Sequence, residues 1–362
     1  MLVTAVEASP LRSLDATRVE LGGGIVSLIG PNGAGKTNLL EAVYFALTGR
    51  SFRTSDRREL IPFGGRLARA SVLVRDDAGA EHRLLASVSR TEGRRHLLDG
   101  NPSDAAELAR RRPPVAVFSP DRLALVKGPP AERRAHLDAY VAARWPSRAG
   151  LRQRYGQALA QRNALLARLA SGRPADDLEV WDAALAEAAE ALVAARTDAA
   201  AELAAPFAEA AAELALEGGA TLEYAPRAGG AATEIRAGLA ERREADLRLG
   251  RTSWGPHLDE LKVALAGRPL RRYGSQGQQR LALLALLFAE REALLAARRV
   301  APLLLLDDVM SELDPQRRER LVERLASGGQ ALITAAAEES VPPAARRRLV
   351  RAPFTAVRSA AA

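Results

Sequence analysis

One segment constrains the fold of this chain more than any other, because an apolar run passes directly into a glycine-rich loop and then into a helix. Residues 25–29 predict a strand, and residues 35–47 carry apolar side chains at helical spacing. Glycines allow backbone N–H groups to close around phosphates, and the N-terminus of the helix adds a favourable dipole. The segment therefore predicts a nucleotide site in which Lys36 reaches the β- and γ-phosphates and the Thr37 hydroxyl holds Mg²⁺. The loop matches the pattern GxxxxGK[ST] and consists of Gly30, Pro31, Asn32, Gly33, Ala34, Gly35, Lys36 and Thr37.

A second apolar segment supplies the other half of such a site. Residues 302–306 predict a buried strand that ends at Asp307 and Asp308, and ligands of α/β sheets bind at the carboxyl ends of strands. We expect Asp307 to hold Mg²⁺ through water and Asp308 to orient or deprotonate the attacking water, so that Asp308 and Lys36 are the candidate catalytic residues. The alternative is a buried strand that simply meets solvent at two carboxylates, and the P-loop favours the magnesium site.

A polar segment before an apolar helix resembles the signature sequence LSGGQ of ABC ATPases. Ser275, Gly277 and Gln278 match it, whereas Gly274 stands in place of Leu and Gln276 in place of the first Gly. In that superfamily the signature caps the γ-phosphate of ATP bound to the opposite subunit, where a helix N-terminus, a hydroxyl and bare backbone face an anion. The alternative is a polar loop that caps a core helix beginning near residue 279.

The segment 311–314 follows the aspartate pair and resembles the D-loop, which runs along the dimer interface of ABC proteins. Asp314 and Pro315 also predict the N-cap and the first position of a helix. P-loop, signature, aspartate pair and D-loop therefore occur in ABC order. The stretch between P-loop and signature is longer than in ABC transport subunits and too short for the long coiled coil of SMC proteins.

Both ends of the chain alternate strands with helices, whereas the middle is helical. From residue 131 to 216 helix-forming residues dominate, and we expect an antiparallel helical arm broken at 171–174, with one helix at 151–170 and a kink or split at Pro206. Further strands are expected at 2–6, 70–74, 82–88, 115–118, 221–224, 261–265 and 331–334, with a hairpin turn at 76–79. The predicted fold class is α/β, an ABC/SMC-like P-loop ATPase head built from both chain ends (1–130 and 249–362) with an inserted helical arm domain (131–248).

The charge balance points to an acidic partner such as nucleic acid. The formal net charge is +8, and nearly all of the cations are arginine, since lysine occurs only at Lys36, Lys127 and Lys262. Arginine contacts to phosphates are blind to sequence, and aromatic residues, at 4 %, are too few for platforms that stack single-stranded bases. The clusters 110–112 and 346–348 are candidate phosphate contacts, with solvated helix faces as the alternative for each.

Other features exclude whole classes of protein. Cysteine is absent, which rules out a disulfide framework, thiolate chemistry and Cys-ligated zinc. The start MLVTAVEASP lacks the basic and apolar regions of a signal peptide, and the most apolar stretch, 281–288, is far shorter than the roughly 18–20 residues of a membrane span. We therefore expect a cytoplasmic protein with no membrane partner. His257 could contact phosphate, but a lone histidine more often packs structurally.

Five segments in order resemble the RecF family, namely 30–53, 118–141, 255–261, 274–286 and 303–315. GRSFR after the P-loop helix, the SPD…VKG…RR…LD run and GPH-x-D are specific to that family. The resemblance implies an SMC-like head with a short helical arm, ATP and Mg²⁺ as cofactors, an ATP-dependent homodimer, and slow DNA-stimulated ATP hydrolysis used as a switch. It also implies a role in DNA repair, recombination and replication (single-strand gap repair and the SOS response). The ATP-bound dimer on single-stranded, gapped or junction DNA would promote recombinase loading with recombination mediator proteins.

The chain departs from the wider ABC pattern at three places. The stretch 114–118 lacks the Q-loop glutamine, Thr334 stands where a switch histidine is usual, and Asp308 replaces the commoner glutamate. Two other functions stay open on the sequence alone. One is an ABC-type transport ATPase subunit, against which the long insertion and the RecF-like segments argue. The other is an SMC-like DNA tether, for which an arm of about forty residues per limb is short at 1.5 Å per residue.

Overall fold

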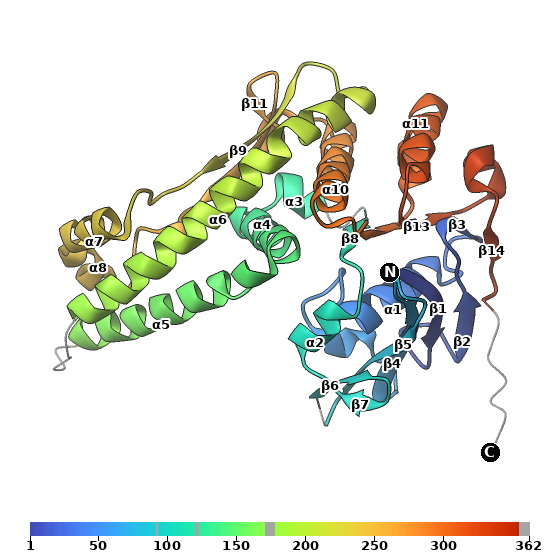
Figure 1. Cartoon of the computed structure of the whole chain (residues 1–362), viewed down its shortest axis with the longest axis horizontal. Coiled ribbons are helices and arrows are strands. Elements are labelled where there is room, and N and C mark those ends of the chain that lie inside the picture. The colour runs from blue at the N-terminus through green and yellow to red at the C-terminus, as the bar shows by residue number, and fades with distance from the viewer. Residues whose placement is uncertain (92, 120–122, 171–177, 355–362) are drawn as a thin grey trace. The chain divides into compact units, whose positions relative to one another are not determined.

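In the computed structural model the chain divides into two compact units, which are described separately (Figure 1). Unit 1 combines Met1–Leu123 with the chain from Leu294 onward, and unit 2 is Ala124–Ala293. The structure describes residues 1–91, 93–119, 123–170 and 178–354. The break expected at 171–174 and part of the family-like segment 118–141 lie outside these residues.

A parallel sheet in unit 1 carries the two segments expected to bind nucleotide. Its strand order is β14-β3-β13-β12-β8, so that β13 lies between β3 and β12. The strands expected around residues 25–29, 115–118, 302–306 and 331–334 are confirmed within a residue or two. The strands are β3 (Gly24–Ile29), β8 (Val115–Phe118), β12 (Leu303–Leu306), β13 (Gln330–Ala335) and β14 (Leu349–Arg351).

An antiparallel sheet with the order β2-β1-β4-β5-β6-β7 forms the second layer of unit 1. The expected hairpin is confirmed, and its turn is closed by the Asp76 carboxylate, which accepts from the backbone N–H groups of Ala78 (3.0 Å) and Ala80 (2.9 Å). The strands are β1 (Leu2–Ala8), β2 (Thr17–Glu20), β4 (Leu67–Arg75), β5 (Glu81–Ser89), β6 (Gly93–Leu98) and β7 (Asn101–Pro102).

The helix that follows the P-loop, α1 (Lys36–Thr48), shares one apolar core with both sheets of unit 1. The apolar side chains that predicted this helix are fully buried, among them Leu40, Val43 and Leu47. Burial of each such side chain contributes about 1.5–3 kcal/mol, so the P-loop is anchored by packing at its helical end. The remaining helices of unit 1 are α2 (Ala105–Arg110), α11 (Pro315–Ala326) and the short 3₁₀ helices η1 (Arg57–Leu60), η5 (Val309–Glu312), η6 (Glu338–Ser340) and η7 (Pro343–Ala345).

Unit 2 contains the predicted helical arm. Figure 1 shows α5 (Leu151–Ala170) running alongside α6 (Leu178–Glu213), and the helix expected at 151–170 is confirmed. The expected split at Pro206 is wrong, because α6 continues through it as one helix of about 54 Å at 1.5 Å per residue. Leu203 and Phe207 are buried on either side of the proline, and this packing outweighs its cost of roughly 3 kcal/mol.

The rest of unit 2 joins this arm to the segment that resembles the signature. Strands β9 (Ala220–Ala225) and β10 (Glu260–Leu265) pair antiparallel, as both were expected to be strands, and β11 (Arg268–Pro269) extends the sheet. Unit 2, at Ala124–Ala293, is therefore larger than the arm domain expected at 131–248. It includes β10, because this strand pairs with β9 instead of joining a strand of unit 1. The helices are α3 (Ala124–Lys127), α4 (Pro130–Arg144), α7 (Ala232–Glu241), α8 (Arg243–Leu249), α9 (Leu270–Tyr273) and α10 (Gln276–Arg298), with 3₁₀ turns η3 (Pro146–Arg148) and η4 (Pro256–Leu258).

Buried arginines hold unit 2 together. Arg162, on α5, is fully buried and donates to Asp182 on α6 and to Asp246 on α8, both at 2.7 Å. Arg196, on α6, donates to Asp138 on α4 (2.8 Å) and to Asp259 (3.0 Å), just before β10. Each guanidinium thus neutralises carboxylates from elements far apart in the chain. Among the described residues, no helix combines the length and the apolarity that a bilayer span requires.

Candidate functional site

The P-loop adopts a conformation that its glycines make possible. Gly33 and Gly35 have φ values of +84° and +86°, a region that favours glycine. A Cβ at Gly30 would lie 2.7 Å from the Cβ of Ala352, so this position also has no room for a side chain. Lys36 is buried and its Nζ donates to the carbonyls of Gly30 (2.5 Å) and Pro31 (3.0 Å). Within the described residues, its ammonium group is therefore held over the loop by backbone oxygens alone.

Asp307 connects the P-loop to the end of the neighbouring strands. Its Oδ1 accepts hydrogen bonds from the hydroxyls of Thr37, at the start of α1, and Thr334, on β13, each at 2.9 Å. The side chain is 7 % exposed, and burial raises the pKa of its carboxyl group above the usual value. The two hydroxyls and Arg53 favour the charged form and oppose that rise, while Asp308 adds to it. The structure thus brings together the two residues expected to hold Mg²⁺, Thr37 and Asp307.

Asp308 follows with its backbone in the left-handed region, at φ 51°. Its N–H donates to Thr334 Oγ1 (2.8 Å), and its carbonyl accepts from Ser311 Oγ (2.9 Å). Non-glycine residues in this region cost of order 1 kcal/mol and cluster at functional sites. Within the described part of the chain, the Asp308 carboxylate has no hydrogen-bond or ion-pair partner and is half-exposed. The backbone is fixed while the carboxylate stays available for chemistry.

Thr334 stands at the position where a switch histidine is usual in ABC proteins. It is 1 % exposed, and its single hydroxyl donates to Asp307 and accepts from the Asp308 backbone. The strand order explains this position, because β13 lies between β3 and β12 and Leu306 pairs with Ile333. Thr334 therefore sets the orientation of both aspartates, although it cannot take up a proton as histidine can.

A second layer of polar contacts behind the P-loop helix was not identified from the sequence. Glu41, on α1, is fully buried and accepts from Arg12 (2.5 and 3.0 Å) and from Ser51 Oγ. Arg53 donates to Asn38 (3.1 Å) beside the start of the same helix. Ser51 and Arg53 belong to the GRSFR segment, so the family-like sequence was the available signal, but only the fold shows which carboxylate they surround.

The signature-like segment forms a helix cap. Ser275 N–H donates to Gln278 Oε1 (2.8 Å) and Gln278 N–H donates to Ser275 Oγ (3.2 Å), the reciprocal arrangement of a capping box. The helix begins at Gln276, three residues before the expected start, so Gly277 and Gln278 lie in its first turn. A Cβ at Gly277 would meet only Ser275 Oγ, at 3.9 Å. The chain itself therefore leaves room for a side chain at Gly277.

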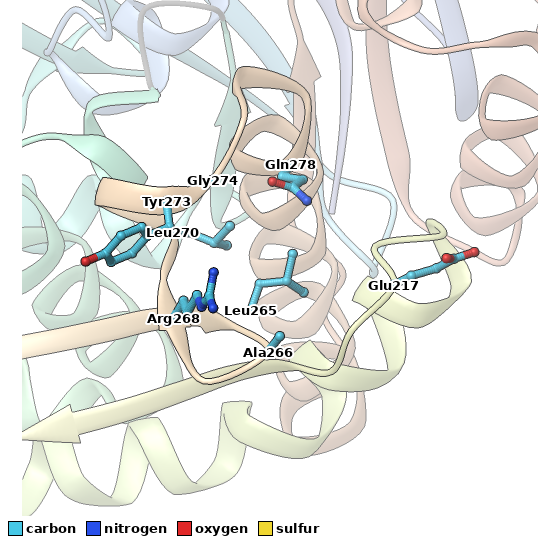
Figure 2. A pocket seen from close by; sticks show the side chains of 8 residues that line it. All are labelled: Glu217, Leu265, Ala266, Arg268, Leu270, Tyr273, Gly274 and Gln278. Atoms are coloured by element: carbon cyan, nitrogen blue, oxygen red, sulfur yellow. The ribbon is translucent and has the colours of Figure 1, made fainter.

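A hollow of about 260 Å³ lies beside this cap, entirely within unit 2 (Figure 2). Tyr273, at its rim, is 64 % exposed, which is unusual for an aromatic side chain of its size. The lining residues are Glu217, Leu265, Ala266, Arg268, Leu270, Tyr273, Gly274 and Gln278. The exposed tyrosine and the exposed Ser275 and Gly277 form one continuous stretch of surface along the chain.

Three other predicted positions have structural contacts. His257 stacks on Tyr155, its Nδ1 lies 2.7 Å from the tyrosine hydroxyl and its Nε2 lies 3.2 Å from Thr252 O, while burial lowers its pKa. Arg346 donates to Val341 O at 2.6 Å, and the Arg348 guanidinium packs over Gly22. These contacts favour the structural interpretation of His257 and of two arginines in the cluster 346–348.

Asp314 accepts from Arg317 N–H (2.9 Å) as the predicted N-cap of α11.

Comparisons with known proteins show which family this chain resembles over most of its length. The family model described as RecF/RecN/SMC N terminal domain matches residues 2–355. The DNA replication and repair protein RecF of Streptomyces avermitilis is 39 % identical over 356 residues, which cover 92 % of this chain and 93 % of that protein. The protein of the same name from Anaeromyxobacter sp. is 40 % identical over 320 residues, 85 % of each chain. A solved structure of the recombination mediator protein RecF-ATP in the RecFOR pathway superposes with a TM-score of 0.85, at 28 % identity, over 94 % of this chain and 93 % of that one.

Proposed function

The chain belongs to the RecF family of DNA replication and repair proteins, and we propose that it is an ATP-dependent DNA-binding switch in repair, replication and recombination. In its ATP-bound state a homodimer forms on single-stranded, gapped or junction DNA in the cytoplasm and promotes recombinase loading with recombination mediator proteins. This assignment replaces the alternatives of a transport subunit and a DNA tether. One observation carries the proposal: Thr37 of the P-loop and Asp307 of the neighbouring strand end meet at 2.9 Å.

The donor set of this site fits ATP with Mg²⁺. Among the described residues, the Lys36 ammonium contacts only carbonyl oxygens, so it is available to a phosphate without the loss of an ion pair. A hydroxyl and a carboxylate in contact are hard oxygen ligands of the kind that Mg²⁺ takes from proteins that bind nucleotides. No arginine in the described part of the chain lies within hydrogen-bond distance of the buried Asp307 carboxylate, and its charge is therefore available to a cation.

Each residue of the site then has a separate task. Lys36 donates to the β- and γ-phosphate oxygens, and the backbone N–H groups of the P-loop surround the phosphates. Thr37 and Asp307 hold Mg²⁺, which when bound supplies positive charge at the phosphate oxygens. Asp308 orients the attacking water and accepts its proton. Thr334 fixes the Asp308 backbone through a neutral hydroxyl, which cannot take up a proton as a histidine can. We therefore expect hydrolysis to be slow, as suits a switch. We also expect DNA to stimulate it.

The signature-like cap supports the homodimer. Ser275 and Gly277 are exposed at the start of α10, where the helix dipole favours an anion. A Cβ at Gly277 would be tolerated by the chain itself, so the glycine suits close approach by a group from outside it. We propose that this group is the γ-phosphate of ATP bound to the second copy, with the exposed Tyr273 part of the same interface.

Binding to gapped duplex DNA, compared with ATP and with ADP at one salt concentration, tests this function. We expect the full chain to bind at least about tenfold more tightly with ATP, a difference of about 1.4 kcal/mol. Lys36→Ala should bind equally weakly with both nucleotides. Lys262→Ala is the matched control, because it removes a half-exposed lysine on β10 outside the site and outside the family-like segments, and it should keep the difference between nucleotides. Equal affinity of the unaltered chain with ATP and ADP would contradict the proposal.

A further inference from the structure

Three arginines gather at the end of the P-loop helix, where no part of the proposed nucleotide site lies. Arg50 directly follows Gly49, the residue that ends α1 in the left-handed conformation. Arg57 lies in the first turn of η1. Arg94, on β6, lies on the same face of its strand as His96, and the His96 ring packs so closely on Gly49 that a Cβ there would lie 2.1 Å from it. The strand and the helix end thus meet at one place, η1 packs on β5, the strand that pairs with β6, and we call these three residues the arginine cluster.

The described residues do not neutralise the arginine cluster. The guanidinium groups of Arg50, Arg57 and Arg94 form no ion pair or hydrogen bond with any of them. Their mutual proximity is visible in the pKa of Arg94, which is lowered first by burial and then by the charges of Arg57 and Arg50. Arg112, from the sequence cluster 110–112, is half-buried nearby, and Arg50 likewise contributes to lowering its pKa. The fold therefore adds a residue from the predicted basic run to arginines that are distant in sequence.

A structural explanation accounts for only part of this arrangement. A cation after the last turn of α1 interacts favourably with the helix dipole, which suits Arg50 but is worth only a few tenths to 1 kcal/mol. Among the described acidic residues, those nearest to the cluster along the chain are Asp56 and Glu59, and Asp56 uses one oxygen to accept from the Arg58 N–H as the cap of η1. Neither carboxylate contacts the cluster. Repulsion among the three guanidinium groups thus has no compensation from the described residues.

His96 adds an independent observation. Burial, with Arg94 and Arg57 nearby, lowers its pKa to about 4, so the imidazole is neutral at physiological pH. Its Nδ1 is buried without a hydrogen-bond partner among the described residues. The ring that packs on Gly49 therefore neither adds to nor compensates the charge of the arginine cluster.

We propose that the arginine cluster binds the phosphodiester backbone of DNA. Guanidinium groups recognise phosphate oxygens through paired hydrogen bonds, and all three members of the cluster are arginines, which favours the phosphodiester backbone as the partner. The inference rests on the proposed function in that it requires a DNA-binding protein. It goes beyond that function by assigning contacts to the end of α1 and β6, away from the P-loop and the signature-like cap.

The test is the triple variant Arg50→Gln/Arg57→Gln/Arg94→Gln in the full chain, with ATP and a gapped duplex. We expect affinity at about 0.1 M salt to fall roughly ten- to a hundredfold, and the slope of log affinity against log salt to become shallower by about 2–3, since each phosphate contact contributes about 0.9. ATP affinity should be unchanged. The thermal midpoint should stay equal or rise, because repelling charges are removed, whereas a merely structural cluster would lower it.

The matched control is Arg69→Gln/Arg154→Gln/Arg236→Gln, which removes the same charge from exposed arginines on three separate elements. An equal loss of affinity in this control would overturn the inference, because net charge alone would then explain the effect. Unchanged DNA affinity of the cluster variant would also overturn it. The inference would fail in the same way if inorganic phosphate bound the unaltered chain at the arginine cluster and DNA did not. If the unaltered chain bound no DNA at all, the proposed function itself would fail, a result distinguishable from either.

Discussion

Buried carboxylates occur in both units, and they are compensated in different ways. In unit 2, Asp182 and Asp246 share the buried Arg162, while Asp138 and Asp259 share Arg196. In unit 1, Glu41 likewise pairs with Arg12, whereas among the described residues Asp307 is held only by the hydroxyls of two threonines, and its pKa is raised by burial. The first arrangement is complete within the folded chain, whereas the second keeps a charge that a bound cation would neutralise.

The difference teaches how to separate structural from functional ionisable groups in one molecule. A buried carboxylate with an arginine contributes to holding elements together, and breaking such a pair costs about 3–5 kcal/mol. A buried carboxylate without a cation costs stability in the free protein and gains it back with a ligand. Asp308 extends the contrast, because its strained backbone is fixed and its carboxylate is left without a partner among the described residues.

The largest expected effect comes from breaking the compensated side of this comparison. Arg162→Leu leaves Asp246 buried without a cation and Asp182 with Arg243 alone, and we expect it to lower the free energy of unfolding by about 3–5 kcal/mol in urea titrations. Arg154→Leu, on the exposed face of the same helix, is the control and should change it by less than about 0.5 kcal/mol. Similar effects of the two variants would mean that the ion pairs of Arg162 stabilise the fold no more than an exposed arginine does.

Removal of the Thr334 hydroxyl tests the uncompensated side. Thr334→Val deletes one donor to Asp307 and the acceptor for the Asp308 N–H, so we expect ATP turnover to fall about ten- to a hundredfold with ATP affinity nearly unchanged. Thr334→Ser keeps the hydroxyl and should retain most of the activity. Equal turnover in the valine and serine variants would show that this hydroxyl does not position the aspartates.

A smaller effect separates two half-buried histidines, His257 and His96. His257 has partners for both ring nitrogens, whereas Nδ1 of His96 has none among the described residues, and its pKa lies at about 4. Between pH 6.5 and 4 the unfolded chain binds a proton at His96 that the folded chain does not, so stability falls as the pH is lowered through this range. We expect His96→Leu to remove about 1 kcal/mol of the stability difference between pH 7 and pH 5, measured by urea titration. An unchanged difference would place the His96 pKa near its ordinary value.

Much of the fold could be predicted because the informative signals are local. Strands β3, β8 and β12 are short apolar runs, and the loop after β3 has a fixed pattern of glycines and lysine. The order of the strands could not be read in this way, since it depends on pairings between segments hundreds of residues apart. The continuity of α6 through Pro206 was missed for a related reason, because tertiary packing outweighs the local preference of proline.

In the candidate site, too, the residues with local sequence signals could be predicted and those that depend on the tertiary structure could not. Lys36, Thr37 and Asp307 could be named from the sequence, and the structure brings them together, while their roles and those of Asp308 and the signature-like residues stay predictions. The bridging position of Thr334 required the strand order, and Glu41 required the packing behind α1. The arginine cluster lay beyond prediction, since its members come from three elements and only one basic run pointed toward it.

The most direct test of the central claim, that Asp307 keeps its charge for Mg²⁺ with ATP, is thermal unfolding of Asp307→Asn with and without saturating MgATP. The unaltered chain should gain about 2.7 kcal/mol at a hundredfold excess over Kd. The variant should match or exceed it in stability without ligand, since no arginine loses a partner, and should lose most of the gain with MgATP. Asp182→Asn in unit 2, tested alongside, should be destabilised by several kcal/mol without ligand because it breaks the pair with Arg162. Destabilisation of Asp307→Asn without ligand, together with full retention of the MgATP effect, would contradict the account.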